Sequence, residues 1–396
     1  MIKTIAILGS TGSIGKILLN TVKKNKNFFK IILLTANEDY KNLYNQAKKY
    51  DVKNLIITNE ASYKILKDKC KKTNINVYNN FNVFDKIFKK KIDYTMNSIV
   101  GFAGLKPTLN IIKFTKQVAI ANKESIICGW NLIKKESIAN KTKIIPIDSE
   151  HFSIWTSLNE LNIVNCKNLN KKIQNIFITA SGGPFKNTPY ADLKKISINQ
   201  AIKHPTWKMG KKISIDSATL VNKLFEVIEA QRLFNIQIKK ISIKIHPQSY
   251  IHSIIKFRNG LIKICAHEPN MSIPILNSLD SNLHHISKNK INFNILNNLN
   301  FTDVDKKKFP VIKILKNYPN YCTLFDTALV SINDELVNLF LNKKISFDDI
   351  FKNLIKILNL SSIKKLKKIV PKNYKEISEI NDFVRLKTLK LSICLS

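Results

Sequence analysis

Short apolar runs alternate with longer amphipathic segments along the first 150 residues of the chain. Strand-like runs lie at 4–8, 31–35, 54–58, 94–101 and 117–121. The segments between them carry apolar residues at helical spacing. A period near 3.6 residues indicates a helix, and a short apolar run indicates a buried strand. The alternation therefore predicts a parallel sheet with helices on both faces.

The pattern changes after residue 150. The segment KIIPIDSEH at 143–151 predicts a strand that ends in polar residues, and further long strands mix with helices beyond it. From about residue 311 the apolar spacing is helical. We therefore expect an α/β chain with an N-terminal Rossmann-type dinucleotide-binding domain, a central α+β domain, a connector and a small C-terminal helical bundle, at 1–150, 151–285, 286–310 and 311–396.

A glycine-rich turn, GSTGSIG, joins the first predicted strand to the first predicted helix, with Gly9, Gly12 and Gly15 at equal spacing. Backbone N–H groups at the start of a helix can hold a pyrophosphate, because the helix dipole is positive there. The strand–turn–helix context favours dinucleotide binding. The alternative is a turn that only packs a helix on a strand.

Two acidic residues, Glu38 and Asp39, follow the second predicted strand, about twenty residues past these glycines. An acid at this position binds a ribose 2′-hydroxyl and repels a 2′-phosphate, so the pair by itself favours NADH over NADPH. A solvated turn is the alternative, and Lys41 lies close by.

The segment HPTWKMGKKISIDSATLVNKLFE at 204–226 concentrates polar groups that suit a small anionic ligand. It holds hydroxyls, an amide, an ammonium and a carboxylate, with the last three at helical spacing. Trp207 and Met209 stand just upstream and could close over a pocket. An amphipathic helix with a solvated face is the alternative.

Three carboxylates indicate a metal site. Asp148 and Glu150 stand two apart in a predicted strand, where such side chains share one face. With Glu226 they would form an all-oxygen ligand set, which suits Mg²⁺ or Mn²⁺ rather than Zn²⁺. For Asp148 alone, a helix N-cap is the alternative.

Two further segments stand at predicted strand ends. Ser181 opens SGGP after the strand-like IFITA, and small residues with accessible amides can bind phosphate there. Lys123, in ANKES, could neutralise an oxyanion. A tight turn and an ordinary surface lysine are the respective alternatives.

Charge and cysteine content narrow the possible partners. The chain has 65 basic and 28 acidic residues, but only three of the basic ones are arginine. Nucleic-acid readers rely on arginine, so we expect no specific nucleic-acid partner. No apolar run is long enough for a transmembrane helix. Six cysteines without a C-x-x-C pair indicate reduced thiols in the cytoplasm.

Seven motifs together resemble the 1-deoxy-D-xylulose 5-phosphate reductoisomerase family. They are GSTGSIG, ANKES, PIDSEH, SGGPF, HPTWKMGKKISIDSAT, NK-x-x-E and IHPQSYIHS, which follow the family's order from residue 7 to about 275. The resemblance implies a homodimeric enzyme whose central domain is catalytic and dimerising. It further implies that the enzyme uses Mg²⁺ or Mn²⁺ and NADPH to rearrange and reduce 1-deoxy-D-xylulose 5-phosphate to 2-C-methyl-D-erythritol 4-phosphate, an isoprenoid precursor of the non-mevalonate pathway.

The resemblance also implies roles for individual residues. The metal ligands would be Asp148, Glu150 and Glu226. The substrate would be held by Ser149, Ser181, His204, Ser217, Asn222, Lys223 and Glu226. The catalytic set would be Lys123, Glu150, Lys223, His204 and Trp207, supported by His252 and Glu229. The cofactor would contact Thr11, Gly12, Ser13, Ile14, Asn37, Asn122, Glu124, Met209 and Gly210.

Three positions depart from the family pattern. Leu224 stands where the family has glycine, the segment 279–282 replaces an expected Trp-Pro-Asn, and Glu38-Asp39 replaces a basic or neutral segment. Aspartate-semialdehyde- or homoserine-type dehydrogenases would share the nucleotide domain but lack the three carboxylates. The remaining alternatives are a basic nucleic-acid or scaffold protein with a degenerate nucleotide fold, and an enzyme weakened by drift, with intact motifs but low stability.

Overall fold

The computed structural model describes residues 2–163, 168–207, 209–279 and 291–393. By its contacts the chain divides into two units. Unit 1 comprises 2–125, 131–148 and the described part of 271–285. Unit 2 comprises 126–130 and the described parts of 149–270 and 286–396. The four domain ranges expected from the sequence stay a prediction.

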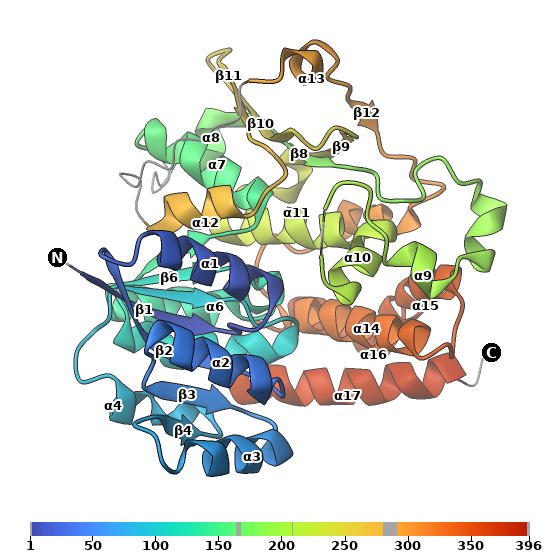
Figure 1. The fold of residues 1–396 in the computed structure, drawn as a ribbon. Helices are drawn as coiled ribbons and strands as arrows, with labels where there is room; N and C mark the ends of the chain where they lie inside the picture. Colours follow the sequence, from blue (N-terminus) through green and yellow to red (C-terminus); the bar gives the residue numbers. More distant parts are fainter. Residues whose placement is uncertain (1, 164–167, 208, 280–290, 394–396) are drawn as a thin grey trace. The chain divides into compact units, whose positions relative to one another are not determined.

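Unit 1 is built on a seven-stranded sheet with the order β4-β3-β2-β1-β5-β6-β7, in which every neighbouring pair is parallel (Figure 1). The order reverses between β1 and β5, as in doubly wound folds that bind ligands at this point. The predicted Rossmann-type sheet is thus confirmed. Its strands are β1 (Lys3–Leu8), β2 (Phe29–Ala36), β3 (Asn54–Ile57), β4 (Asn76–Tyr78), β5 (Tyr94–Asn97), β6 (Gln117–Ile120) and β7 (Lys143–Pro146).

Three helices of unit 1, α2, α3 and α6, start at capping side chains. Asp39, Asn59 and Asn122 each accept a hydrogen bond from a backbone N–H three residues later, which satisfies a donor of the first turn. The helices are α1 (Ser13–Lys24), α2 (Tyr40–Tyr50), α3 (Glu60–Cys70), α4 (Phe84–Ile87), α5 (Leu105–Ile111), α6 (Lys123–Ala139, whose 126–130 belong to unit 2) and α12 (Ser272–Leu279). The late helix α12 packs on α1, and its Ser278 hydroxyl lies 2.7 Å from the Tyr94 hydroxyl of β5.

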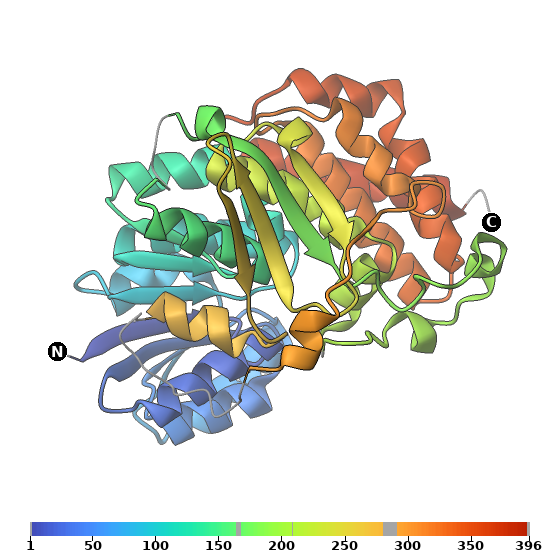
Figure 2. The same cartoon turned by 90° about the horizontal axis from the view of Figure 1, so that it is seen from above.

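Unit 2 contains a mixed sheet with the order β11-β10-β8-β9-β12 (Figure 2). Only β8 and β9 pair in parallel, and the other neighbours are antiparallel. Its strands are β8 (Ile173–Ala180), β9 (Ile241–Ile245), β10 (Ile251–Phe257), β11 (Ile262–Ala266) and β12 (Thr302–Asp303). The helices of its first part are α7 (Ser149–Glu160), α8 (Leu169–Lys172), α9 (Ile198–Ala201), α10 (Lys211–Ala218), α11 (Val221–Phe234) and α13 (Phe293–Asn297).

The C-terminal part of unit 2 is helical, as expected. It consists of α14 (Leu324–Leu341), α15 (Phe347–Leu358), α16 (Ser361–Lys364) and α17 (Tyr374–Ile393), with α14 and α17 lying side by side (Figure 1). Capping boxes at Thr323 and Ser346 begin α14 and α15. A buried ion pair, with Arg232 Nη2 2.9 Å from Asp326 Oδ1, ties α14 to α11.

One local prediction was wrong. The strand expected over 143–151 ends at Pro146, and α7 begins at Ser149. Glu150 therefore lies in the first turn of a helix, and Asp148 immediately precedes that helix. The shared strand face that was to bring the two carboxylates together does not exist.

No helix within the described ranges is both long and apolar enough to cross a membrane.

Candidate functional site

The glycine turn of unit 1 has the geometry of a close-approach loop. Gly9 adopts a φ of +85°, and a Cβ on Gly15 would lie 2.5 Å from the Gly9 carbonyl oxygen. Only glycine fits both positions. No acidic residue stands in the first turn of α1, so its positive end is not neutralised locally. Thr11, Gly12, Ser13 and Ile14 lie in this turn or at its junction with α1.

After β2, the polar side chains have structural partners. Asn37 accepts a 2.8 Å hydrogen bond from the Thr58 hydroxyl. Asp39 caps α2 by accepting from the backbone N–H of Asn42 at 3.1 Å and from its side-chain amide at 2.7 Å. The Asp39 carboxylate is thus already engaged, which leaves the exposed Glu38 as the one acid of the pair without this capping role.

The start of α6 fixes a buried lysine. Asn122 caps this helix by accepting from the Ser125 N–H at 2.7 Å, and its amide donates to the Gly101 carbonyl at 2.8 Å. Lys123, the first helical residue, forms an ion pair with Asp148. Their side chains are 7% and 14% exposed, so this pair is shielded from solvent. Glu124, beside them, is buried as well.

Two carboxylates of unit 2 share one ammonium group. Lys223 Nζ lies 2.5 Å from Glu150 Oε1 and 2.6 Å from Glu226 Oε2. The other oxygen of Glu150 accepts from the Ser149 hydroxyl at 2.8 Å, and that of Glu226 accepts from the Asn222 amide. These five side chains come from α7 and α11 and are all buried.

The chain itself places Asp148 close to this cluster, because only Ser149 separates Asp148 from Glu150. One carboxylate oxygen from each of Asp148, Glu150 and Glu226 lies within 4.8 Å of the others. Three such oxygens suit a hard divalent cation. The ligand set expected from the sequence is therefore brought together, although by a helix start rather than by a strand.

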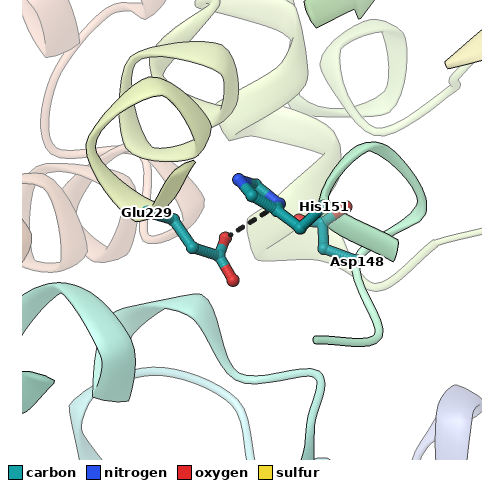
Figure 3. A group of neighbouring side chains, drawn as sticks. All are labelled: Asp148, His151 and Glu229. Carbon is teal, nitrogen blue, oxygen red and sulfur yellow. Dashed lines mark ion pairs between the residues drawn. The ribbon is translucent and has the colours of Figure 1, made fainter. Parts of the chain in front are cut away.

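His151, for which the sequence predicts no role, supports this cluster. Its Nε2 lies 2.8 Å from the Glu226 carbonyl oxygen, and its Nδ1 lies 3.4 Å from Glu229 Oε2. Figure 3 shows His151 on α7 facing Glu229 on α11, with Asp148 on the segment that leads into α7. The signal available in the sequence was its position directly after Glu150 in PIDSEH.

A second polar cluster in unit 2, which we call the corner, consists of Ser181, His204 and Ser217. His204 Nδ1 accepts from the backbone N–H groups of Thr206 and Trp207, at 3.2 and 3.0 Å. The proton of the neutral ring is then on Nε2, which donates to Ser181 Oγ at 3.0 Å. Ser181 also accepts from the Gly183 N–H at 3.1 Å, so its own hydroxyl proton can be directed at a ligand.

Gly183 connects this corner to α10. It adopts a φ of +67°, and a Cβ there would lie 3.1 Å from the Ser217 carbonyl oxygen. The SGGP loop therefore packs closely against the end of α10. Burial lowers the pKa of His204 to about 4, and the positive charge of Lys223 adds to this effect.

The segment between His204 and α10 is partly buried. The half-buried Trp207 meets His252 edge-on, with ring centroids 6.2 Å apart, and His252 stacks on His267 at 3.8 Å. Met209 is half-buried and Gly210 is exposed. The unexpected Leu224 is fully buried in α11, so a glycine there would leave a cavity in this chain. Of the 279–282 departure, residues 280–282 lie outside the described residues.

The depressed pKa of His204 predicts a pH-dependent stability. The unfolded chain titrates near 6.5, whereas the folded ring titrates near 4, so the unfolded state binds the proton first as pH falls. The contribution of the neutral His204 ring to the free energy of unfolding is complete above pH 6.5 and is lost as the pH falls towards 4. Urea unfolding across this range should show a smaller pH slope of the free energy of unfolding for His204→Asn than for the wild type. Equal slopes would contradict the low pKa.

Models of one family match most of the chain. The model described as 1-deoxy-D-xylulose 5-phosphate reductoisomerase matches residues 5–129, and its C-terminal domain model matches 144–234. A further model, the DXP reductoisomerase C-terminal domain, matches 267–387.

Known proteins agree with these matches. A 1-deoxy-D-xylulose 5-phosphate reductoisomerase from Pelagibacter ubique (strain HTCC1062) is 52% identical and aligns with 99% of this chain and 100% of its own length. One from Buchnera aphidicola subsp. Schizaphis graminum is 38% identical over 98% of both chains.

Solved structures give the same result. A DOX-P reductoisomerase in complex with NADPH, fosmidomycin and magnesium superposes with a TM-score of 0.91 at 28% identity, covering 100% of this chain and 99% of that one. The Zymomonas mobilis reductoisomerase in complex with NADPH has a TM-score of 0.84 at 30% identity over 99% of both chains. The chain belongs to the 1-deoxy-D-xylulose 5-phosphate reductoisomerase family.

Proposed function

We propose that this protein converts 1-deoxy-D-xylulose 5-phosphate to 2-C-methyl-D-erythritol 4-phosphate by a metal-dependent rearrangement followed by reduction with NADPH. The observation that carries the proposal is the buried cluster in which Lys223 bridges Glu150 and Glu226. A dehydrogenase that only transfers hydride has no need for such a cluster. Membership of the family favours the same activity.

The residues present fit a divalent cation. Two buried carboxylates that already share a cation indicate that this place favours positive charge. Asp148, Glu150 and Glu226 would hold Mg²⁺ or Mn²⁺ through oxygen atoms, as these ions prefer. When bound, the ion supplies Lewis acidity towards the carbonyl and hydroxyl oxygens of the substrate.

The polar side chains around the cluster would bind the two ends of the substrate. Ser149, Lys123 and Lys223 would hold oxygens at the reacting end of the substrate. Ser181, Ser217 and Asn222 would donate hydrogen bonds to the phosphate. His204 keeps the Ser181 hydroxyl available for that role, since its neutral ring donates to Ser181 and not to the ligand.

Trp207 and Met209 would exclude water from the reacting carbon atoms. The backbone N–H of Trp207 is bound to His204 Nδ1, so binding at the phosphate corner and closure of the segment after it are coupled. Excluding water protects a reactive enolate-like species from side reactions.

The first unit would bind NADPH. The turn from Thr11 to Ile14 would hold the pyrophosphate, since the glycine positions leave room for close backbone approach. Asn37, Asn122, Glu124, Met209 and Gly210 would complete the cofactor contacts. Both structural relatives named above were solved with NADPH. The Asp39 carboxylate caps α2, so its oxygens already have partners other than the ribose 2′-hydroxyl of NADH.

The protein would act as a homodimer. Strand β11 forms one edge of the described sheet. Its Ile262 and Ile264 are both 54% exposed, and Leu261 just before it is 47% exposed. A sheet edge with exposed aliphatic residues invites pairing with another chain. A second copy of the chain presents the same strand and so fits a two-fold contact.

The cytoplasm is the compartment that suits this enzyme. Its described cysteines Cys70, Cys128, Cys265 and Cys322 form no disulfide. Recovery of the native protein from an oxidising compartment after cell fractionation would contradict this placement.

The activity predicts substrate-dependent oxidation of NADPH that requires Mg²⁺ or Mn²⁺. Glu226→Gln keeps the shape of the side chain but removes its charge, so we expect kcat/KM to fall about 100-fold or more and the apparent metal affinity to weaken. Glu160→Gln, at the exposed end of α7, is the control and should retain activity. A well-folded wild type without substrate-dependent activity would refute the function, and a fully active Glu226→Gln variant would remove Glu226 from the ligand set.

Cofactor choice can be measured with the same assay. We expect a higher kcat/KM with NADPH than with NADH. The exposed Glu38 opposes a 2′-phosphate and would accept from the 2′-hydroxyl of NADH, so Glu38→Gln should lower the KM for NADPH by about two- to fivefold and should not lower the KM for NADH. A clear preference of the wild type for NADH would overturn the choice of cofactor.

The dimer is testable in solution. The double variant Ile262→Glu/Ile264→Glu places two charges on the exposed face of β11 and should sediment as a monomer. Ile138→Glu introduces a charge at an isoleucine elsewhere that is even more exposed, at 67%, and should leave the dimer intact. A wild type that is monomeric at micromolar concentration in analytical ultracentrifugation would rule out the homodimer.

A further inference from the structure

Helix α10 lies between the segment that carries Trp207 and the end of the phosphate corner, and it is held by charged groups. Lys212 and Asp216 stand one turn apart on it, with Lys212 Nζ 2.9 Å from Asp216 Oδ2. Their side chains are only 18% and 3% exposed. A solvated face would leave both in water, so these charges face protein.

The partners of both residues are on α14. The amide of Asn333 donates to Asp216 Oδ1 at 2.8 Å, and Lys212 Nζ lies 3.1 Å from Asp334 Oδ1. Asn333 is fully buried, and Asp334 is nearly so. The two contacts fix both the rotation and the axial position of α10 relative to α14.

The network continues to α17. Arg385 Nη2 lies 2.9 Å from Asp334 Oδ2, and its Nη1 lies 3.4 Å from Glu335 Oε2. The Nε of Arg385 donates to Asn381 Oδ1 at 3.0 Å. A chain of polar contacts thus runs from α10 through α14 to the last helix, which belongs to the C-terminal part of the protein.

The cost of burying charged groups indicates that this network does more than stabilise the fold. Burying charges costs several kcal/mol per ion, and apolar residues of equal volume often give equal or greater stability. Stability alone therefore does not account for a network of five charged side chains, three of which lie on or contact the short helix α10. Directional contacts, unlike apolar ones, do specify a single orientation.

The orientation of α10 matters at both of its ends. Its N-terminal end follows the extended Gly210, directly after the segment that carries Trp207 and Met209. Its C-terminal end carries Ser217, whose backbone lies against Gly183 of the SGGP loop. Holding α10 still would keep Ser217 in register with Ser181 while the Trp207 segment closes.

We propose that Asp216 and Asn333 are positioning residues, through which the C-terminal helices hold the phosphate-binding corner in its binding geometry. The proposal rests on the function proposed above, in which Ser181 and Ser217 bind the substrate phosphate. It gives the C-terminal helical part a role in substrate affinity, although none of its residues needs to touch the substrate.

Two substitutions on α14 separate positioning from stability. Asn333→Ala removes the hydrogen bond to Asp216. Ser331→Ala is the matched control, because it removes an equally buried hydrogen bond, 2.9 Å from Ser331 Oγ to Asn381 Oδ1, that lies at the α17 end of the network and does not involve α10. Asn333→Gln retains a donor and tests rescue, and Lys212→Met replaces Asn333→Ala if the latter does not fold.

The readouts are Tm, KM and kcat with the sugar phosphate, and the Kd of inorganic phosphate by calorimetry. We expect Asn333→Ala to raise KM and the phosphate Kd about tenfold, with kcat changed less than about threefold. Ser331→Ala should lower Tm comparably and leave KM and Kd unchanged, and Asn333→Gln should recover part of the affinity. Unchanged KM and Kd in Asn333→Ala, or equal rises in Ser331→Ala, would overturn the proposal.

The phosphate measurement keeps this inference separate from the proposed function. If the wild type binds phosphate but does not turn over the sugar phosphate, the proposed function fails while the comparison of Kd values still decides the role of Asn333. If the wild type is active and the affinities do not respond to Asn333→Ala, the inference alone fails.

Discussion

The ion pairs of Lys223 with Glu150 and Glu226 are the interaction on which the site in unit 2 depends. The pair with Glu150 joins α7 to α11, and the pair with Glu226 lies within α11. Both are buried, where an unpaired charge would cost several kcal/mol. The two helices must therefore lie so that each charge meets its partner. His151 adds a second link between the same helices, from its ring to the Glu226 carbonyl. The residues of the site therefore also determine how α7 and α11 pack against each other.

Much of the fold could be predicted because local patterns determine it. The strands of unit 1 are apolar runs, and its glycine turn is fixed by steric limits that a sequence displays directly. The spacing of Asn222, Lys223 and Glu226 on one helix was also evident, and all three lie on α11. The strand expected through Glu150 was wrong because nine residues are too few to separate a strand from a strand followed by a helix start.

The rest could not be predicted because it depends on partners far away in the chain. Asp216 resembles a solvated helix residue until Asn333, 117 positions later, is placed beside it. His151 gives no sign in the sequence that its ring will reach the backbone of α11. The tautomer of His204, likewise, follows from two backbone N–H groups whose direction no residue pattern encodes.

The return of α12 to unit 1 has a consequence for biosynthesis. Its Ser278 meets Tyr94 of β5, 184 positions earlier, and its helix packs on α1. On the ribosome, about half of unit 2 must therefore emerge before unit 1 can be completed. Until then, the surface of α1 that α12 covers is exposed to the cell. A nascent chain that pauses after α1 and before α12 presents this apolar surface to chaperones.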